Sequence, residues 1–443
     1  MRPAHHHQRA AGLVPAQTRR RDKPGGSGGG RHTECACYLL AILAVLAAGV
    51  AAAQDEPSAD QRFLAGLRQR GLYQLAEKYC DEELGKPELS ATRRAELTVE
   101  LSLVLAERAA GSPPAGRAPL WERAWQVTED FAREHPDHPR LIQVRLQGAL
   151  GLLAHGELAR QEAELSTDRQ RLLEPARAQL REAIRRLREV EKAVEQMLRR
   201  PDREGPAVEG GLSARQLESI QDSVRYELAR AYRNQGQCYG AGSDDRADAL
   251  IQAGAVLDPL ARLDTEHPLA WRSRIDQIVC YRLLEDYPKA AQKLSALAAQ
   301  KPPAEIALRA RAEQLRLALA ENKLQEAVTL ASAGRQIDGV TSPELDLAVL
   351  QTCIAGWRTA RQANRNDEAE QWYTRAVGQV RLIEREHGPY WMRRAETLLA
   401  GSVGGSPEGS DLATTIHPHP TTSETLMEAA ESVFGEPIHM FRL

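Results

Sequence analysis

The sequence predicts an all-α fold, an α-solenoid of antiparallel helical hairpins that stack in chain order. Ala, Leu, Arg and Glu dominate the 443 residues, and aromatic residues make up only 5%. Side chains of this size suit close helix packing better than sheet packing. Apolar residues recur at spacings of three and four, and helix–turn–helix units recur at intervals of about forty residues. Together these observations favour a repeat array over a single globular core.

The clearest hairpin spans residues 265–303. Its first apolar run passes through Trp271 and Ile278, a break follows at Glu285–Tyr287, and a second run spans Ala290–Ala299. Prolines mark the ends of this hairpin and of others along the chain, because proline cannot continue a helix but can begin one. These prolines are Pro87, Pro136, Pro201, Pro268, Pro303, Pro343 and Pro389.

The same signals predict the other helices in order. We expect hairpins at 60–87 and 90–134, then two longer hairpins up to residue 264, which include a long amphipathic helix over 173–197. Residues 205–211 read as a loop, and further helices are expected at 212–238, 247–263, 305–321, 324–333, 344–363, 367–386 and 390–400. The helix at 390–400 has no obvious partner. A Gly/Ser-rich linker begins at residue 401 and precedes a short helix near 423–434.

Residues 1–53 predict a secretory signal peptide. Seven basic residues precede an apolar run from Tyr38 to Val50, and Ala51-Ala52-Ala53 forms a small-residue cleavage site. The mature chain would begin at Gln54 and be exported to the periplasm or cell envelope. The alternative is an uncleaved signal anchor, which would also place the helical part outside the cytoplasm. The predicted regions are therefore 1–53, 54–136, 137–264, 265–400 and 401–443.

Charge and cysteine spacing exclude several function classes. Residues 1–53 carry seven basic and two acidic side chains, so their removal changes the formal net charge from −3 to −8. An acidic body argues against a nucleic-acid partner. The remaining cysteines, Cys80, Cys238, Cys280 and Cys353, have no Cys-x-x-Cys spacing, which argues against a zinc or redox site. Two interpretations stay open for Cys238 and Cys280: a disulfide, or two buried free thiols.

Several hairpins resemble tetratricopeptide repeats, in which two antiparallel helices pack through small residues. The family's turn and the start of its second helix are matched by Tyr73–Ala76, Tyr287–Ala290 and Leu324–Ala327. The family's small–aromatic–small pattern in the second helix is matched by Ala369, Tyr373 and Ala376. The resemblance is most specific over 265–390. It departs from the family where the small first-helix residue is replaced by Ile278, Leu315 and Trp357, and in the long hairpins between Pro136 and Pro268. Another type of helical-hairpin solenoid is the alternative.

No motif for catalysis, cofactor binding or metal binding occurs in the mature chain. It contains no phosphate-binding loop, no dinucleotide-binding glycine pattern and no His-Glu-x-x-His sequence. The Gly-x-Ser-x-Gly match at 25–29 lies in the leader, without a strand and helix around it. His135 and His138, and likewise His417 and His419, lack acidic or sulfur partners at ligand spacing. We therefore expect no enzyme activity, no cofactor and no metal.

The resemblance implies a binding groove along the first helices. Counting back from Ala290, Ala327 and Ala369 in the family's register gives a mostly cationic set, and arginine suits the capture of carboxylates. The set is Arg272, Arg282, Arg309, Arg316, Gln351, Arg358, Arg361 and Gln362. The family's Lys and Asn clamp for a peptide C-terminus is not reproduced, because Ile275, Ala312 and Ile354 stand in between. The alternative is a solvated helix face whose arginines pair with local acids such as Glu313.

These features predict an exported scaffold that mediates protein–protein interaction in the cell envelope. Its partner would be a protein or peptide, with an acidic or extended segment lying along the first helices. The competing hypothesis is an accessory or recognition module of an envelope enzyme whose catalytic part is supplied by another chain. Self-association through the open ends of the array is the third hypothesis.

Overall fold

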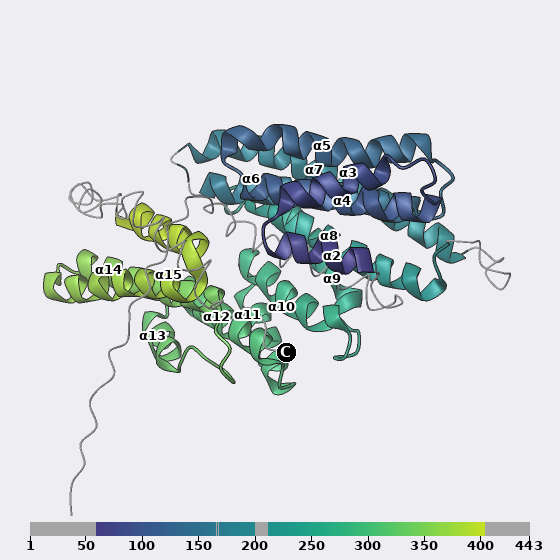
Figure 1. Ribbon diagram of the computed structural model, residues 1–443. Coiled ribbons are helices and arrows are strands. Elements are labelled where there is room, and N and C mark those ends of the chain that lie inside the picture. Colours follow the sequence, from purple (N-terminus) through teal and green to yellow (C-terminus); the bar gives the residue numbers. More distant parts are fainter. Residues whose placement is uncertain (1–58, 165, 167, 200–210, 404–443) are drawn as a thin grey trace, which may run out of the picture. The chain divides into compact units, whose positions relative to one another are not determined.

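The computed structural model describes residues 59–403, apart from 165, 167 and 200–210. In this part of the chain the only β-structure is an isolated bridge between Ile337 and Val340. The predicted all-α class is confirmed (Figure 1). The signal peptide, most of the predicted 205–211 loop, and all but the start of the region from 401 lie outside the described residues. None of the described helices is both long enough and apolar enough to cross a bilayer.

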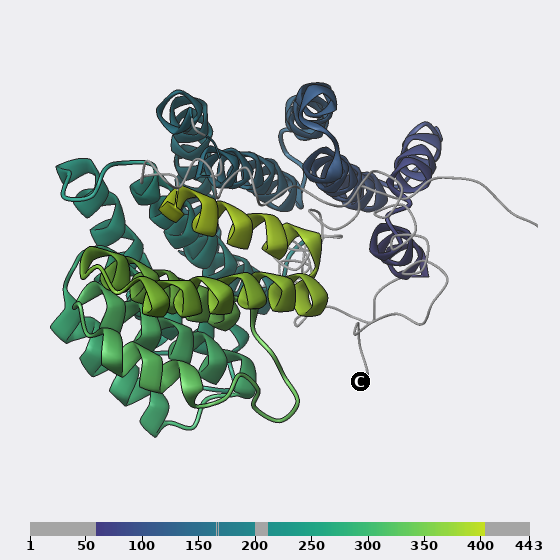
Figure 2. The ribbon, with the colours of Figure 1, turned by 90° about the vertical axis from the view of Figure 1, so that its left-hand side faces the viewer.

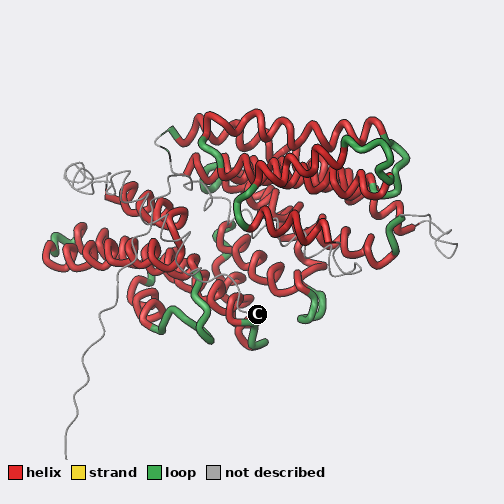
Figure 3. Tube along the Cα trace, in the orientation of Figure 1, coloured by secondary structure: helices red, strands yellow, loops and turns green. Residues whose placement is uncertain are grey.

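The helices follow one another with short connections, and consecutive helices run side by side (Figure 3). Their bounds are α2 Ala59–Gln69, α3 Tyr73–Leu84, α4 Ala91–Gly111, α5 Pro114–Glu134, α6 Leu141–Glu164, α7 Arg169–Arg199, α8 Ala214–Gln237, α9 Asp244–Ala261, α10 Pro268–Leu283, α11 Tyr287–Ala299, α12 Ala304–Ala320, α13 Leu324–Ser332, α14 Pro343–Gln362 and α15 Asn366–Val403. Most predicted boundaries agree within a few residues. Helix α5 begins at Pro114, because proline is favoured at the first position of a helix.

The first helices of successive hairpins form a layer of their own. Besides its sequence neighbours, α4 packs against α6, α6 against α8, α8 against α10, α10 against α12, and α12 against α14. Figure 2 shows the hairpins following one another in this order. We call α4, α6, α8, α10, α12 and α14 the first-helix layer. This stacking of each hairpin on the next is the solenoid arrangement that the sequence predicts.

The same turn closes four hairpins. In each, a residue with positive φ follows the first helix, and the backbone N–H after it donates to a carbonyl oxygen five residues earlier. This is a Schellman-type helix end, which favours glycine or asparagine because positive φ strains other residues. The positive-φ residues are Gly71, Glu285, Asn322 and Asn364.

A buried alanine lies five residues after each of these turns. The four alanines are at most 2% exposed, and a larger side chain would collide with the core of its hairpin. They are Ala76, Ala290, Ala327 and Ala369. The second helix of each of these four hairpins therefore carries a buried small residue close to its start.

Replacing Ala290 with Leu should destabilise the α10–α11 hairpin. Ala290 is fully buried with Ile275, Ile278 and Leu294, so added methylenes must displace well-packed neighbours. Overpacking of this kind costs about 1–3 kcal/mol, which denaturant unfolding will measure. The matched control is the exposed Ala296 on the same helix, where Leu should change stability little. Equal effects at the two positions would contradict the assigned packing.

In the last hairpin, the small first-helix residue is displaced by one position from the predicted register. A Cβ atom added at Gly356 would lie 2.6 Å from the ring of Trp372 on α15. Gly356 therefore allows α14 to approach the Trp372 side chain of α15 closely, whereas the neighbouring Trp357 is half-buried. The sequence register missed this because it placed Trp357 at the position of the small residue.

The helix predicted at 390–400 does have a partner, contrary to expectation. Helix α15 is interrupted at Gly388, whose φ is 79°. Beyond this break Trp391, Ala395 and Leu399 are buried in one apolar cluster with Ile354 of α14. The prediction that this helix lacks a partner was wrong, because its three apolar residues at spacing four pack against apolar residues of the preceding hairpin.

All four cysteines in the described part of the chain are free and buried. The Cys238–Cys280 disulfide is absent, and the alternative of buried thiols is the one found. Burial raises the pKa of the Cys280 thiol to about 12 and that of Cys238 to about 11. Thiols of this kind carry almost no reactive thiolate near neutral pH and behave as small apolar groups.

Candidate binding face

The eight predicted groove residues all lie on the first-helix layer. Arg272 and Arg282 are on α10, Arg309 and Arg316 are on α12, and the others are on α14. Three of the arginines make ion pairs that the sequence register did not assign. Those pairs determine what this face can bind.

Glu313 is held between two of the predicted groove arginines. Arg282 of α10 donates from Nε to Oε2 at 2.5 Å, and Arg316 donates from Nη1 to Oε1 at 2.6 Å. Burial disfavours the ionised carboxylate, but the two guanidiniums outweigh it and lower the pKa of Glu313 to about 2. Arg316 also donates to Gln351 Oε1 and to the Glu344 carbonyl, both at 3.2 Å. These contacts join α10, α12 and α14.

Asp276 repeats the arrangement one hairpin earlier. It accepts from Arg233 Nη1 of α8 at 2.7 Å, from Arg309 Nη2 of α12 at 3.1 Å and from the Tyr226 hydroxyl at 2.9 Å. Its side chain is only 3% exposed. Burial opposes ionisation, but Arg233 and Arg309 outweigh it and lower the pKa of Asp276. Helices α8, α10 and α12 are thereby joined through one carboxylate.

Every member of the first-helix layer carries such a buried acid. The set, which we call the carboxylate ladder, consists of Glu107, Glu157, Glu227, Asp276, Glu313 and Asp346, one on each of α4, α6, α8, α10, α12 and α14. Their exposures range from 0 to 6%, and each pairs with at least one basic side chain. An acid is almost never fully buried unless it is paired, so a repeated buried acid is a feature of this array.

The ladder changes the interpretation of the predicted groove. Arg282, Arg309 and Arg316 are partly buried, with side chains 19, 30 and 20% exposed. For these three, pairing with local acids is the interpretation that the contacts favour. Arg358 and Gln362 are exposed, and Arg272 is half-buried. Among the described residues, neither Arg272 nor Arg358 contacts a carboxylate.

The ladder leaves positive charge on the α10–α14 part of the layer. Arg309 of α12 shares Asp276 with Arg233 of the neighbouring α8, and Arg282 and Arg316 share Glu313. Each of these carboxylates cancels only one of its two partners. Arg272 and Arg358 add to the excess, so this part of the layer is cationic although the sequence as a whole carries a formal net charge of −3. We call the exposed side of α10, α12 and α14 the first-helix face.

Sequence reasoning missed the ladder because charged residues crowd every helix of this chain. One local signal was available: an acid followed three residues later by an arginine that pairs with it, as in Glu227–Arg230 and Glu313–Arg316. The same spacing also occurs on exposed faces, such as Glu182–Arg185 on α7. Spacing alone therefore does not separate a buried pair from a surface pair.

Comparison with known proteins adds little. No family model matches this chain. A stretch of 46 residues is 54% identical to part of the dihydrolipoyl dehydrogenase of Thermus scotoductus, and it covers 10% of this chain and 10% of that enzyme. A likeness over a tenth of each protein shows neither a shared fold nor a shared activity.

Proposed function

We propose that this protein is an exported helical-repeat scaffold that mediates protein–protein interaction in the cell envelope. It binds an acidic, extended partner segment along the first-helix face. The observation that supports this is the excess of arginine over acidic residues along α10, α12 and α14. The location rests on the basic, apolar and small-residue order of residues 1–53.

The ladder favours anion binding because it fixes arginines without neutralising them. A guanidinium has five N–H donors, and Arg282 directs only part of its donors to Glu313. A buried carboxylate that holds a guanidinium in place also lowers the entropy lost when that guanidinium binds a second anion. An extended segment crossing α10, α12 and α14 would meet arginines at each helix.

The test replaces arginines of the face that are outside the ladder. Arg272→Ala with Arg358→Ala should weaken binding of a fluorescent oligoglutamate peptide about two- to thirtyfold, because exposed charge pairs contribute about 0.2–1 kcal/mol each. Binding should also weaken as salt rises from low ionic strength, since exposed charges are screened within about 10 Å at 0.1 M. Fluorescence anisotropy measures both effects. Arg309 and Arg316 are kept because their removal would disturb Asp276 and Glu313.

The matched control removes two charges from α7. Arg181 and Arg185 are both 51% exposed, so Arg181→Ala with Arg185→Ala changes the net charge equally. If both double variants weaken peptide binding equally, the effect comes from overall charge, and the proposal that the first-helix face binds the segment is wrong. A pull-down from envelope extract then identifies the natural partner. Capture of a substrate-processing enzyme would favour the accessory-module hypothesis.

A further inference from the structure

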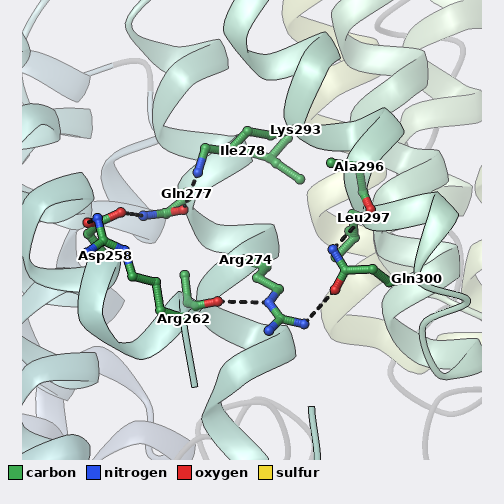
Figure 4. A pocket seen from close by; sticks show the side chains of 10 residues that line it. Asp258, Arg262, Arg274, Gln277, Ile278, Lys293, Ala296, Leu297 and Gln300 are labelled. Carbon is green, nitrogen blue, oxygen red and sulfur yellow. Dashed lines mark hydrogen bonds and ion pairs between the residues drawn. The ribbon is translucent and has the colours of Figure 1, made fainter. Parts of the chain in front are cut away.

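A pocket of about 340 Å³ opens between α9, α10 and α11. Its walls come from the C-terminal ends of α9 and α11, which are second helices and do not pack closely on each other. Ile278 of α10 and Leu297 of α11 contribute apolar surface to its lining. Figure 4 shows Arg274 between the α9 side and Gln300, with Gln277 and Lys293 above it.

Arg274 is fixed in this pocket by neutral groups. Its Nε and Nη2 donate to the carbonyl oxygens of Ala261 and Leu263, both at 2.9 Å, and Nη1 donates to Gln300 Oε1 at 2.8 Å. Its guanidinium also stacks on Trp271, 4.9 Å from the ring centroid. Three of five N–H groups are used, which leaves two donors and a full positive charge. No carboxylate within the described ranges contacts it.

Lys293 supplies a second charge that no acid balances. Its Nζ donates to Gln277 Oε1 at 2.9 Å, and two of its N–H groups remain. Gln277 is buried and passes its own amide hydrogens to Asp258 Oδ1 and to the Gly254 carbonyl. Asp258 is also paired with Arg262. Each of these acceptor groups already has a donor, whereas Arg274 and Lys293 keep unused N–H groups.

We propose that this pocket binds a compact oxyanion, a carboxylate or phosphate group carried on a short apolar frame. The pocket lining has an excess of positive charge, because it contains Arg262, Arg274 and Lys293 but one acid, Asp258. The unused N–H groups can donate to the oxygen atoms of an anion. The volume lies at the small end of ligand sites, which suits a small anion better than a drug-sized molecule. The pocket is lined by α9, α10 and α11, so this site is separate from the acidic-segment site proposed above.

Isothermal titration with inorganic phosphate and with succinate, at constant ionic strength, tests the site. We expect saturable binding of at least one of the two probes and a concentration-dependent rise in Tm. Lys293→Met should weaken that binding at least tenfold, while Lys293→Arg retains most of it. Tighter binding of phosphate assigns a phosphate ligand, and tighter binding of succinate assigns a carboxylate. Arg274 is unsuitable for substitution because it holds the end of α9.

Lys289→Met is the matched control. Lys289 lies one turn earlier on α11, is exposed and lies outside the pocket lining, so its loss removes the same charge. The control should bind as the unsubstituted protein does. Absence of saturable binding of both probes, or equal weakening by Lys289→Met and Lys293→Met, would overturn the proposal.

Discussion

Replacing Arg230 with Met should lower the free energy of unfolding by about 3–5 kcal/mol, because removal of one partner leaves buried charge without compensation. Arg230 is 6% exposed and lies between Glu157 of α6 and Glu227 of α8. Burial is the largest influence on both carboxyls. For Glu157, the positive charges of Arg230 and Arg160 outweigh the effect of burial, so its pKa is lowered. For Glu227, burial and the nearby negative charge of Glu157 outweigh the effect of Arg230, so its pKa is raised. Urea unfolding, followed by circular dichroism, measures the loss.

Arg185→Met provides the control for this prediction. Arg185 is 51% exposed and pairs with Glu182 and Glu189 on its own helix, so its loss should cost less than about 1 kcal/mol. The combined variant Arg230→Met, Glu157→Leu and Glu227→Leu should recover much of the stability, since it removes the unpaired charges as well. A cost for Arg230→Met no larger than that for Arg185→Met would show that these groups are solvated.

Glu313→Gln should destabilise the protein by about 3 kcal/mol at pH 7, and by much less near pH 2. The folded-state pKa of Glu313 is about 2, below the ordinary value of 4.5, because Arg282 and Arg316 outweigh the effect of burial. A lowered carboxyl pKa contributes stability that is fully present above pH 4.5 and is lost as the pH falls through 2. The shift corresponds to a free energy on the order of 3 kcal/mol. The substitution removes this contribution at every pH.

The measurement is urea unfolding of both proteins between pH 7 and pH 2. The difference between them should shrink only below about pH 4.5, where the carboxyl of the unfolded chain begins to bind protons. Glu82→Gln is the control, because Glu82 is 65% exposed and pairs with Lys78 on the same helix. A difference that stays constant across this range would contradict the assigned environment of Glu313.

The sequence predicts the hairpins well because their signals are local. Proline positions, apolar spacing and the turn residues each involve a few neighbours, so the positions of Ala76 and Ala290 follow from the turns before them. The register fails at Trp357, where the choice between adjacent small and large residues depends on how Trp372 of the facing helix is oriented. That orientation is a tertiary property.

The candidate face was only partly predictable for the same reason. The register placed Arg282, Arg309 and Arg316 on the correct helices, and the alternative interpretation named Glu313 as a pairing acid. Neither showed that Asp276 lies between arginines of two neighbouring hairpins. Which of many arginines faces a neighbouring hairpin depends on the rotation of each helix about its axis. A rotation of one residue, about 100°, would exchange a buried pair for an exposed one.

The shared carboxylates also restrict how this array could gain or lose repeats during evolution. Asp276 belongs to one hairpin, yet its two arginines come from the hairpins before and after it. Deleting either neighbour would remove a counter-ion, and inserting an unrelated hairpin would separate the acid from it. A duplicated unit would be tolerated only if it brought both an acid and an arginine in the same register. Loss or gain of single repeats should therefore be rarer here than in arrays whose hairpins meet through apolar side chains alone.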